Sequence, residues 1–306
     1  MTEPHLPGVA VRAPAKINLH LGVGPVRPDG YHPLATAYQA ISLFSTVTAT
    51  PAEDWSVTCS GGVGIDVSGV PLDDTNLALR AAKLLARECE VDQPVALHID
   101  KGIPVAGGLA GGSADAAATL LACSVLWDLS LPPMRLLELA GELGSDVPFG
   151  LLGGSAAGHG RGELVEPLAD AGSWDWVVLT FPSGMSTPAV YAAFDALHAD
   201  VTVPDPEIPP ALVAALRSAD VHGLAHSLGN DLQPASLRMR PQLAEPLQAG
   251  LDASALAALV SGSGPTCLFL CSDGEHAVRV AAALASYGRA QVCHGPVSGA
   301  AVLTET

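Results

Sequence analysis

The sequence predicts an α+β fold of two domains. Strand-like and helix-like segments follow one another without the strict alternation of a doubly wound sheet. The 306 residues are enough for two domains of ordinary size. Apolar residues make up 49% of the chain and charged residues 15%, which indicates a sizeable core and excludes a disordered chain. We expect a first domain over residues 1–165 and a second over residues 166–306, divided near the connector Pro167–Ser173.

Apolar periodicity and turn residues predict the elements of the first domain. Alternating apolar residues indicate strands, and Asn76 ahead of apolar residues at helical spacing indicates a capped helix. The expected elements are two short strands within Val9–Val23 separated at Pro14–Ala15, an extended segment over Leu34–Thr50, a helix over Leu77–Glu88, a strand over Val95–Lys101, a helix from Ser113 to Trp127, a helix over Met134–Leu143 and a strand over Gly153–Gly158.

The second domain is predicted by the same signals. Its expected elements are a strand over Trp176–Phe181, a helix over Thr187–His198, two or three helices between residues 210 and 259, a glycine turn and strand over Val260–Leu270, a helix over Glu275–Tyr287 and a strand over Gln291–His294.

Charge and composition narrow the possible partners. The formal net charge is -17, from 14 basic and 31 acidic residues, so the chain repels nucleic acid and anionic membranes. No apolar run is long enough to predict a membrane span. Six cysteines without a C-x-x-C pair favour reduced thiols in a cytoplasmic protein. An anionic ligand would therefore need a local site built from backbone N–H groups and a few cations.

A glycine-rich loop between a strand and a helix is the strongest functional signal. Four glycines within six positions let backbone N–H groups approach a ligand closely. The helix N-terminus beyond them adds unpaired donors and a partial positive charge. We therefore predict a phosphate-binding loop made of Pro104, Val105, Ala106, Gly107, Gly108, Leu109, Ala110, Gly111, Gly112, Ser113 and Ala114.

Ser113 is expected to be the N-cap of that helix, with a hydroxyl that could also face a phosphate or Mg²⁺. The alternative is a purely structural glycine turn. No lysine follows the glycines, so the loop is not of the G-x-x-x-x-G-K-[ST] type, and the G-x-G-x-x-G fingerprint is missing as well. The balancing cation must come from elsewhere in the chain.

Lys16 and Asp146 are the candidate catalytic residues. Lys16 and Asn18 share one side of an apolar strand, where a lysine is costly unless it is paired or functional. Asp146 lies in a Gly/Pro turn, where an aspartate can also be only a capping residue. Phosphoryl transfer to an alcohol requires a cation beside the transferring phosphate and a carboxylate that accepts or orients the hydroxyl proton. This pair would supply both.

Three segments, in their order along the chain, resemble the motifs of the GHMP kinases. They are Pro14–Leu19, the loop from Pro104 to Ala117, and the glycine turn Ser261–Pro265. The resemblance implies a two-domain α+β GHMP kinase fold with the active site in the cleft between the domains. It also implies ATP and Mg²⁺ as cofactors, ATP along Pro104–Ala114, and Lys16 and Asp146 as the catalytic pair. No protein ligand for the metal is predicted.

Within this family, the segments Arg27–His32 and Gly144–Phe149 resemble the branch that phosphorylates the 2-hydroxyl of cytidyl-diphospho-methylerythritol in the non-mevalonate isoprenoid pathway. The resemblance implies that Tyr31 and His32 hold the cytosine, that Tyr191 covers its other face and that Asp146 is the base. Flat stacking partners and an edge hydrogen bond suit a cytosine ring. The implied substrate-binding residues are Asn18, Tyr31, His32, Thr187 and Tyr191.

The loop departs from many relatives at Ala106, Ala110 and Ala114, where glycine or serine is common. We expect Ala106 and Ala110 to keep negative φ angles. Two alternatives remain open: a homoserine or mevalonate-type kinase, and a non-catalytic nucleotide-binding or sensor protein on the same fold. The expected oligomeric state is a monomer or a weak homodimer.

Overall fold

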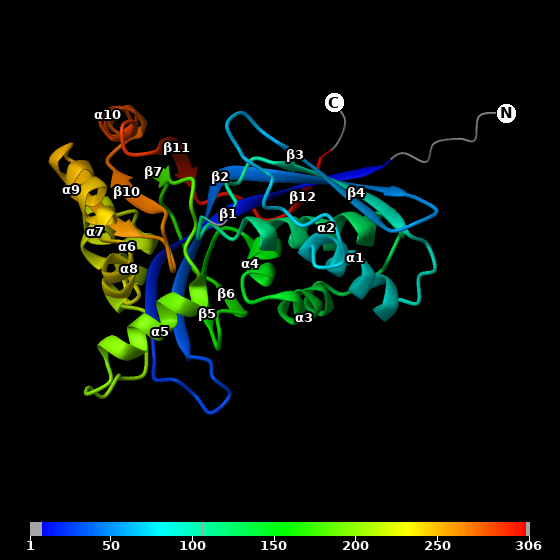
Figure 1. The fold of residues 1–306 in the computed structure, drawn as a ribbon, viewed down its shortest axis with the longest axis horizontal. Coiled ribbons are helices and arrows are strands. Elements are labelled where there is room, and N and C mark those ends of the chain that lie inside the picture. The colour runs from blue at the N-terminus through cyan, green and yellow to red at the C-terminus, as the bar shows by residue number, and fades with distance from the viewer. Residues whose placement is uncertain (1–7, 106, 304–306) are drawn as a thin grey trace.

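Two β-sheets organise the molecule (Figure 1). The computed structural model describes residues 8–105 and 107–303. Eight strands form the first sheet, in which the path β12-β1-β2-β4-β3 is joined by β5, β6 and β8; four strands form the second, in the order β11-β7-β10-β9. The strands are β1 Val9–Val23, β2 Leu34–Pro51, β3 Ser56–Gly61, β4 Val95–Lys101, β5 Ser155–His159, β6 Leu164–Pro167, β7 Trp174–Thr180, β8 Gly229–Asn230, β9 Ala257–Val260, β10 Cys267–Cys271, β11 Arg289–Gly295 and β12 Ala301–Val302.

Helices cover these sheets. In Figure 1, α1 to α4 lie together on one side of the first sheet, while α6 to α9 gather beside β10 of the second sheet. The helices are α1 Leu77–Glu88, α2 Gly111–Leu126, α3 Pro133–Leu143, α4 Val147–Leu152, α5 Thr187–Leu197, α6 Pro210–Ser218, α7 Val221–Ser227, α8 Gln233–Met239, the 3₁₀ helix η1 Pro241–Leu243, α9 Ala244–Asp252 and α10 Gly274–Leu284.

Strand β1 is continuous, and the expected break at Pro14–Ala15 is wrong. It pairs antiparallel with β2 along its length, with a register irregularity between Pro14 and Ala15. Proline lacks the N–H that a ladder needs, and a bulge absorbs the missing bond without ending the strand. Two residues on, the Lys16 backbone N–H donates to the carbonyl of Leu109 at 3.2 Å. This bond ties β1 to the glycine-rich loop.

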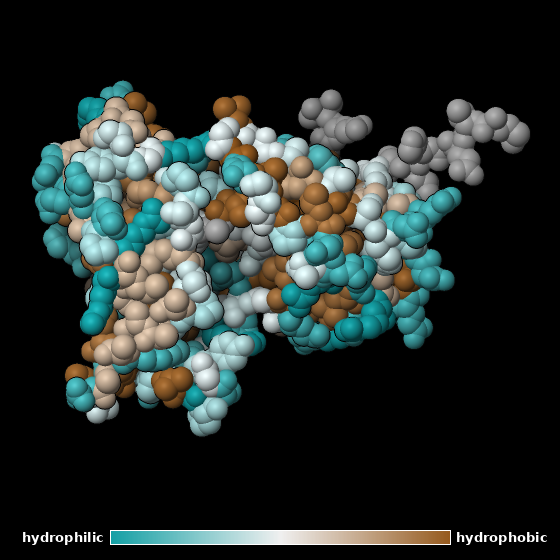
Figure 2. Space-filling model, in the orientation of Figure 1, coloured by the Kyte–Doolittle hydropathy of each residue, from teal (hydrophilic) through white to brown (hydrophobic). Residues whose placement is uncertain are grey.

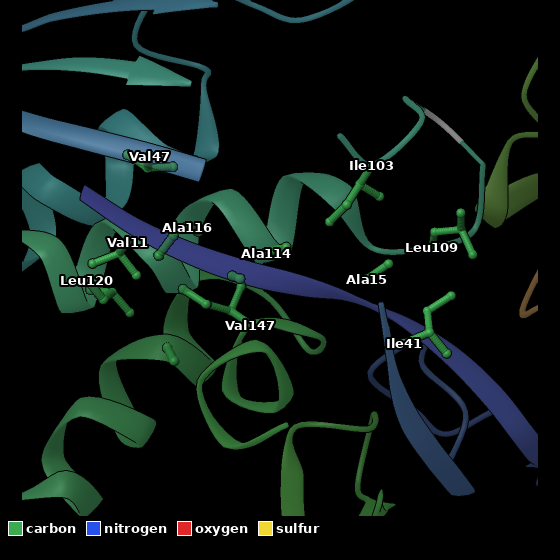
Figure 3. Packing of buried hydrophobic residues seen from close by; sticks show 14 of the residues in the cluster. Val11, Ala15, Ile41, Val47, Ile103, Leu109, Ala114, Ala116, Leu120 and Val147 are labelled. Carbon is green, nitrogen blue, oxygen red and sulfur yellow. The ribbon is translucent and has the colours of Figure 1, made fainter. Parts of the chain in front are cut away.

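Helix α2 packs closely on β1 and β2 because many of its side chains are small and it is buried on most sides. Ala114, Ala116 and Ala118 are each at most 2% exposed. Figure 3 shows Ala114, Ala116 and Leu120 along the part of α2 that meets β1. Burial of apolar surface in such a contact stabilises the fold by about 25 cal/mol per Å². The close packing also leaves α2 little freedom to shift. The N-terminus of α2 is therefore held firmly relative to β1.

The predicted cap of α1 is confirmed. The Asn76 side chain accepts from the backbone N–H groups of Ala78 and Leu79, at 2.9 and 3.3 Å.

The cysteines, all six of which lie among the described residues, are free thiols.

Several short elements differ from the expectation. Strands β3 and β6 and helix α4 were not predicted, and Ala257–Val260 forms strand β9 instead of the end of a helix. Between residues 210 and 259 there are four α-helices and a 3₁₀ turn, where two or three helices were expected. Prolines explain the division, because Pro210, Pro234 and Pro241 each stand in the first turn of a new helix.

The domain boundary at residues 165 and 166 stays a prediction. Strand β6, which spans residues 164–167, pairs with β5 in the first sheet, and the second sheet begins at Trp174. The chain then returns to the first sheet at its end, because β12 pairs with β1. Across residues 8–105 and 107–303, no helix is both long and apolar enough to cross a membrane.

Candidate active site

A cavity of about 740 Å³ lies where β1, the glycine-rich loop, the start of α4 and helix α5 meet. Figure 2 shows the surface hollowed between the two sides of the molecule. Many of the residues singled out in the sequence line this one cavity. They are Lys16, Asn18, Tyr31, His32, Gly107, Gly108, Ala110, Gly111, Gly112, Asp146, Thr187 and Tyr191.

Lys16 and Asp146 face each other at the centre of the site. Lys16 Nζ lies 3.5 Å from Asp146 Oδ1, and the two side chains are 9% and 31% exposed. Lys16 Nζ also donates to Asn18 Oδ1 at 2.9 Å. Asn18 Nδ2 donates in turn to Thr36 Oγ1 at 2.8 Å, which fixes the amide so that its oxygen faces the lysine. The ammonium group is thus held from two sides and keeps one donor for a ligand.

Tyr38 forms a wall behind this pair and was not singled out in the sequence. Lys16 Nζ lies 5.0 Å from the centroid of its ring. Burial, followed by the negative charge of Asp146, raises the pKa of Tyr38 well above its ordinary value. The phenol therefore stays protonated and adds no negative charge beside Lys16. The positive charge of the lysine remains available to an anion in the cavity.

Helix α2 begins at Gly111, so the prediction of Ser113 as N-cap is wrong. The N-cap is Ala110, whose φ of 56° also contradicts the expected negative value. Gly111 and Gly112 adopt helical geometry despite their low propensity, which makes Ser113 the third residue of the helix. Ala110 occupies the left-handed region at a cost of about 1–2 kcal/mol that the surrounding packing sustains.

The first turn of α2 offers backbone N–H groups without intrahelical partners. The first intrahelical bond runs from the Ala114 N–H to the Ala110 carbonyl at 2.9 Å. The N–H groups of Gly111, Gly112 and Ser113 precede this bond and are the orphan donors of a helix N-terminus. They lie at the positive end of a 16-residue helix dipole. A phosphate in the cavity would meet N–H groups without needing a basic side chain on the loop.

The turn at Ser261–Gly264 packs directly against the loop. Gly108 has a φ of 76°, and a Cβ atom there would lie only 2.8 Å from the Ser261 carbonyl oxygen. Glycine is required at this position for both reasons. Gly262 and Ser263 line the cavity, and Ser263 Oγ lies 2.8 Å from Thr187 Oγ1. The third motif thus joins the glycine-rich loop to the start of α5.

Part of the predicted loop lies behind the cavity lining. Leu109 and Ala114 are 1% and 2% exposed and belong to the hydrophobic core. Pro104, Val105 and Ser113 do not line the cavity either, and Ala106 lies outside the described residues. The core residues anchor the loop, and its glycines face the cavity.

Aromatic and polar side chains gather at the other end of the cavity. The His32 ring stacks on Tyr191, with centroids 5.1 Å apart and planes inclined by 30°. His32 Nδ1 lies 2.8 Å from the Gly24 carbonyl oxygen, and Nε2 lies 3.5 Å from Asp195 Oδ1. A carbonyl only accepts, so Nδ1 carries a hydrogen and donates it to Gly24. The predicted placement of cytosine between Tyr31 and Tyr191 stays a prediction.

Arg161 is a further charged residue at this end that the sequence reasoning missed. It lines the cavity, and its guanidinium carbon lies 5.2 Å from the centroid of the Tyr31 ring. Tyr191 lines the same end of the cavity, and burial, followed by the charge of Asp146, raises the pKa of its phenol. One signal could have pointed to Arg161. It is a basic residue inside a Gly158–Gly162 turn, in a chain where acidic residues outnumber basic ones two to one.

Donors for a metal ion are sparse around the cavity. Within the part of the chain that the structure describes, no three His, Cys, Asp or Glu side chains cluster as a metal site. Asp146 and Asp195 are the carboxylates in the cavity lining. Such a donor set fits Mg²⁺ bound largely by phosphate oxygens and water better than a metal held by the protein alone.

Both halves of the chain match models of one protein family. Residues 76–154 match the family described as GHMP kinases N terminal domain, and residues 212–290 match GHMP kinases C terminal. The chain is 51% identical over 303 residues to the 4-diphosphocytidyl-2-C-methyl-D-erythritol kinase of Thermobifida fusca, covering 96% of this chain and 98% of that one. It is also 51% identical to the enzyme of the same name from a Nocardioides species, covering 95% and 98%.

Solved structures show the same fold. A crystal structure of 4-(cytidine 5'-diphospho)-2C-methyl-D-erythritol kinase superposes with a TM-score of 0.76 at 33% identity, covering 93% of this chain and 98% of that chain. Homoserine kinase from Cytophaga hutchinsonii superposes with a TM-score of 0.69 at 18% identity, covering 99% of both chains. The second likeness concerns the fold alone.

Proposed function

This chain belongs to the GHMP kinases, and on that premise we propose that it transfers the γ-phosphoryl group of ATP to the 2-hydroxyl of 4-diphosphocytidyl-2-C-methyl-D-erythritol. The observation that carries the proposal is the 51% identity over 303 residues to an enzyme of that name. The alternative of a homoserine or mevalonate kinase rests on fold likeness at low identity. The reaction belongs to the non-mevalonate route to isoprenoid precursors.

The phosphates of ATP bind at the first turn of α2. Gly111 and Gly112 line the cavity, and their N–H groups precede the first intrahelical bond of α2. Their dipoles stabilise the triphosphate, and Lys16 adds the single full positive charge that lies beside the transferring group. Binding by backbone N–H groups and one lysine suits a chain of net charge -17, because the overall field of such a chain does not attract an anion.

Asp146 acts on the acceptor alcohol. The hydroxyl oxygen attacks the γ-phosphorus, the bond to the β-phosphate oxygen breaks, ADP leaves, and the hydroxyl proton passes to the Asp146 carboxylate. Lys16, 3.5 Å from that carboxylate, offsets charge that builds up on the phosphoryl oxygens. The carboxylate is free for this task because the Asp146 side chain does not cap helix α4.

The cytidine end of the substrate occupies the aromatic end of the cavity. Tyr31, which is 53% exposed, and Tyr191 offer ring faces for stacking. His32 presents its Nε2 edge to the cytosine ring, because Nδ1 is engaged by the Gly24 carbonyl. Arg161 provides a cation near Tyr31. Asn18 and Thr187 line the stretch between the two ends.

Mg²⁺ accompanies ATP in this proposal. The ion neutralises phosphate charge when bound, and its ligands are chiefly phosphate oxygens and water. We also propose a cytoplasmic monomer or weak homodimer without nucleic-acid or membrane partners. The charge of -17 and the six free thiols support this part of the proposal.

A substrate panel tests the proposed function. The purified protein is incubated with MgATP and, separately, with the cytidyl compound, homoserine and mevalonate. ADP release is measured by a coupled assay, and the phosphorylated position is determined by ³¹P and ¹H NMR. We expect turnover with the cytidyl compound alone and a new phosphate ester on its 2-hydroxyl. Phosphorylation of homoserine or mevalonate without turnover of the cytidyl compound would overturn the proposal.

A further inference from the structure

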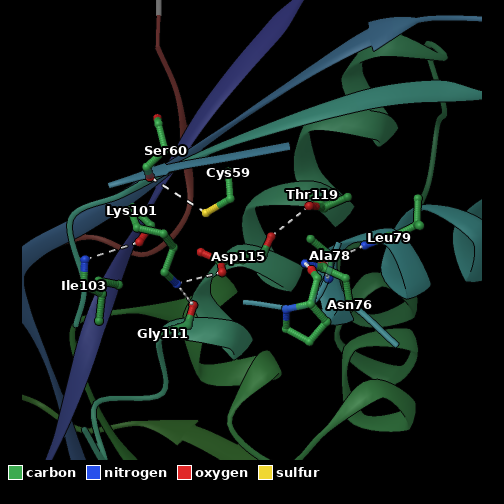
Figure 4. A network of polar contacts seen from close by, with 12 residues as sticks. Cys59, Ser60, Asn76, Ala78, Leu79, Lys101, Ile103, Gly111, Asp115 and Thr119 are labelled. Atoms are coloured by element: carbon green, nitrogen blue, oxygen red, sulfur yellow. Dashed lines mark hydrogen bonds and ion pairs between the residues drawn. The ribbon is translucent and has the colours of Figure 1, made fainter. Parts of the chain in front are cut away.

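A buried ion pair lies beneath the first turn of α2, outside the cavity lining (Figure 4). Lys101 ends β4, and Asp115 stands in the second turn of α2. Lys101 Nζ lies 2.7 Å from Asp115 Oδ2, and the two side chains are 2% and 6% exposed. The chain contains only three lysines, and one of them is enclosed here. The pair is therefore a feature that needs an explanation.

The Lys101 ammonium group also holds the backbone of the phosphate loop. Its Nζ atom donates to the Gly111 carbonyl oxygen at 3.1 Å. A trans peptide unit directs its C=O and N–H groups in opposite directions. Anchoring the Gly111 carbonyl on the inner side therefore directs the Gly112 N–H the other way, and Gly112 lines the cavity. A Cβ atom at Gly111 would lie 3.2 Å from Lys101 Nζ, so glycine leaves the room that this contact uses.

The pair spans the two ends of the glycine-rich loop. Lys101 precedes the loop and Gly111 lies near the end of the loop, in the first turn of α2, so one ammonium group fixes the distance between β4 and α2. Neighbouring bonds brace the same corner: the Gly62 N–H donates to the Lys101 carbonyl at 2.8 Å, and the Thr119 hydroxyl donates to the Asp115 carbonyl at 2.8 Å. These bonds hold both ends of the glycine-rich loop in fixed positions.

Stability alone is a weak reason for such a pair. Burial raises the pKa of Asp115, and the charge of Lys101 only partly opposes this effect. Among the described residues, Asp115 Oδ1 has no hydrogen-bond partner. Buried ion pairs can often be replaced by apolar residues of similar volume without loss of stability. What an apolar pair could not reproduce is the hydrogen bond to the Gly111 carbonyl.

We propose that Lys101 and Asp115 are positioning residues that orient the first peptide units of α2 toward the ATP phosphates, with Asp115 holding the ammonium group in place. The inference rests on the proposed function only in taking ATP as the ligand of that turn. Neither residue touches the substrate or the reacting atoms. Their effect reaches the nucleotide through the Gly111–Gly112 peptide unit.

The test is the double variant Lys101→Met/Asp115→Leu, which replaces the ion pair by an apolar pair of similar volume. Lys101→Met alone would leave a buried carboxylate unpaired and is expected to unfold more readily. The double variant is expected to keep the thermal midpoint within a few degrees. The Kd for a non-hydrolysable ATP analogue, measured by calorimetry, should rise about tenfold, as for the loss of one hydrogen bond to a charged group. The kcat/KM for ATP should fall by up to about 100-fold while the KM for the acceptor alcohol is unchanged.

Two further variants complete the experiment. Lys83→Gln/Asp74→Asn removes the same charges from an exposed pair and should leave every parameter at its wild-type value. Gly111→Ala adds a methyl group against Lys101 Nζ and should also weaken binding of the analogue, which decides the matter if the double variant fails to fold. The proposal would be overturned if the double variant had the wild-type Kd for the analogue and the wild-type kcat/KM for ATP. If the double variant does not fold, wild-type values in Gly111→Ala would overturn it. The failure of the proposed function would show instead as an unreactive cytidyl compound with wild-type protein.

Discussion

Replacing Asp146 with asparagine is expected to lower kcat by about 10²–10⁴-fold while the Kd for ATP stays nearly unchanged. The amide has the size of the carboxylate but cannot accept the hydroxyl proton. Its side chain does not cap α4, so the helix should form as before. In the proposed mechanism the ATP phosphates bind at the N-terminus of α2, on a different element. Steady-state kinetics with the cytidyl substrate and calorimetry with an ATP analogue measure the two effects separately.

Asp74→Asn is the matched control, because it makes the same chemical change at a side chain that is 80% exposed. It should leave kcat at the wild-type value. Retention of more than a tenth of the wild-type kcat by Asp146→Asn would remove this carboxylate from the role of general base. It would leave Asp146 as a partner of Lys16 only.

Lys16→Met is expected to lower kcat by about 10²–10³-fold and to weaken ground-state ATP binding much less. Methionine keeps most of the apolar stem in a position that is only 7% exposed, so the fold should persist. What is lost is the charge beside the transferring phosphoryl group, where negative charge shifts most in the transition state. The measurement compares kcat/KM with the Kd of an ATP analogue.

The control for this variant is Lys83→Met, which removes an exposed lysine whose partner Asp74 lies in solvent. Its kinetics should match the wild type. If Lys16→Met instead raised the Kd by the same factor as it lowered kcat/KM, the lysine would contribute uniform binding and no specific stabilisation of the transition state.

Long helices and strands with a clear apolar pattern were predictable from the sequence. Their exact ends, and the irregularities within them, were not. The strand Val95–Lys101 and the helix Leu77–Glu88 with its Asn76 cap follow from alternation and capping rules. The continuity of β1 through Pro14 depends on its bulged pairing with β2, which no local pattern encodes. The start of α2 at Gly111 shows the same limit. The hydrogen bond from Lys101 holds Gly111 in a helix that glycine propensity disfavours, and a larger side chain there would crowd Lys101 and Ile103.

The gathering of the candidate residues in one cavity could be expected from the resemblance to a family, and their roles stay predictions. Lys16 and Asp146 are 130 positions apart, and nothing in their spacing brings them to 3.5 Å. The needs of phosphoryl transfer and the resemblance to the GHMP kinases implied that they act together. Tyr38 and Arg161 were missed because one reads as a core aromatic and the other as a turn residue. Their roles emerge only when β2 and the turn after β5 are seen to face the same cavity.

The most direct test of the account is a crystal structure with a non-hydrolysable ATP analogue and cytidine diphosphate bound together. The account predicts the β- and γ-phosphates against the N–H groups of Gly111 and Gly112, and the γ-phosphate within contact of Lys16 Nζ. Asp146 should lie on the far side of that phosphate, toward the cytidine ligand. A triphosphate bound away from the first turn of α2, or an Asp146 carboxylate directed out of the cavity, would contradict it.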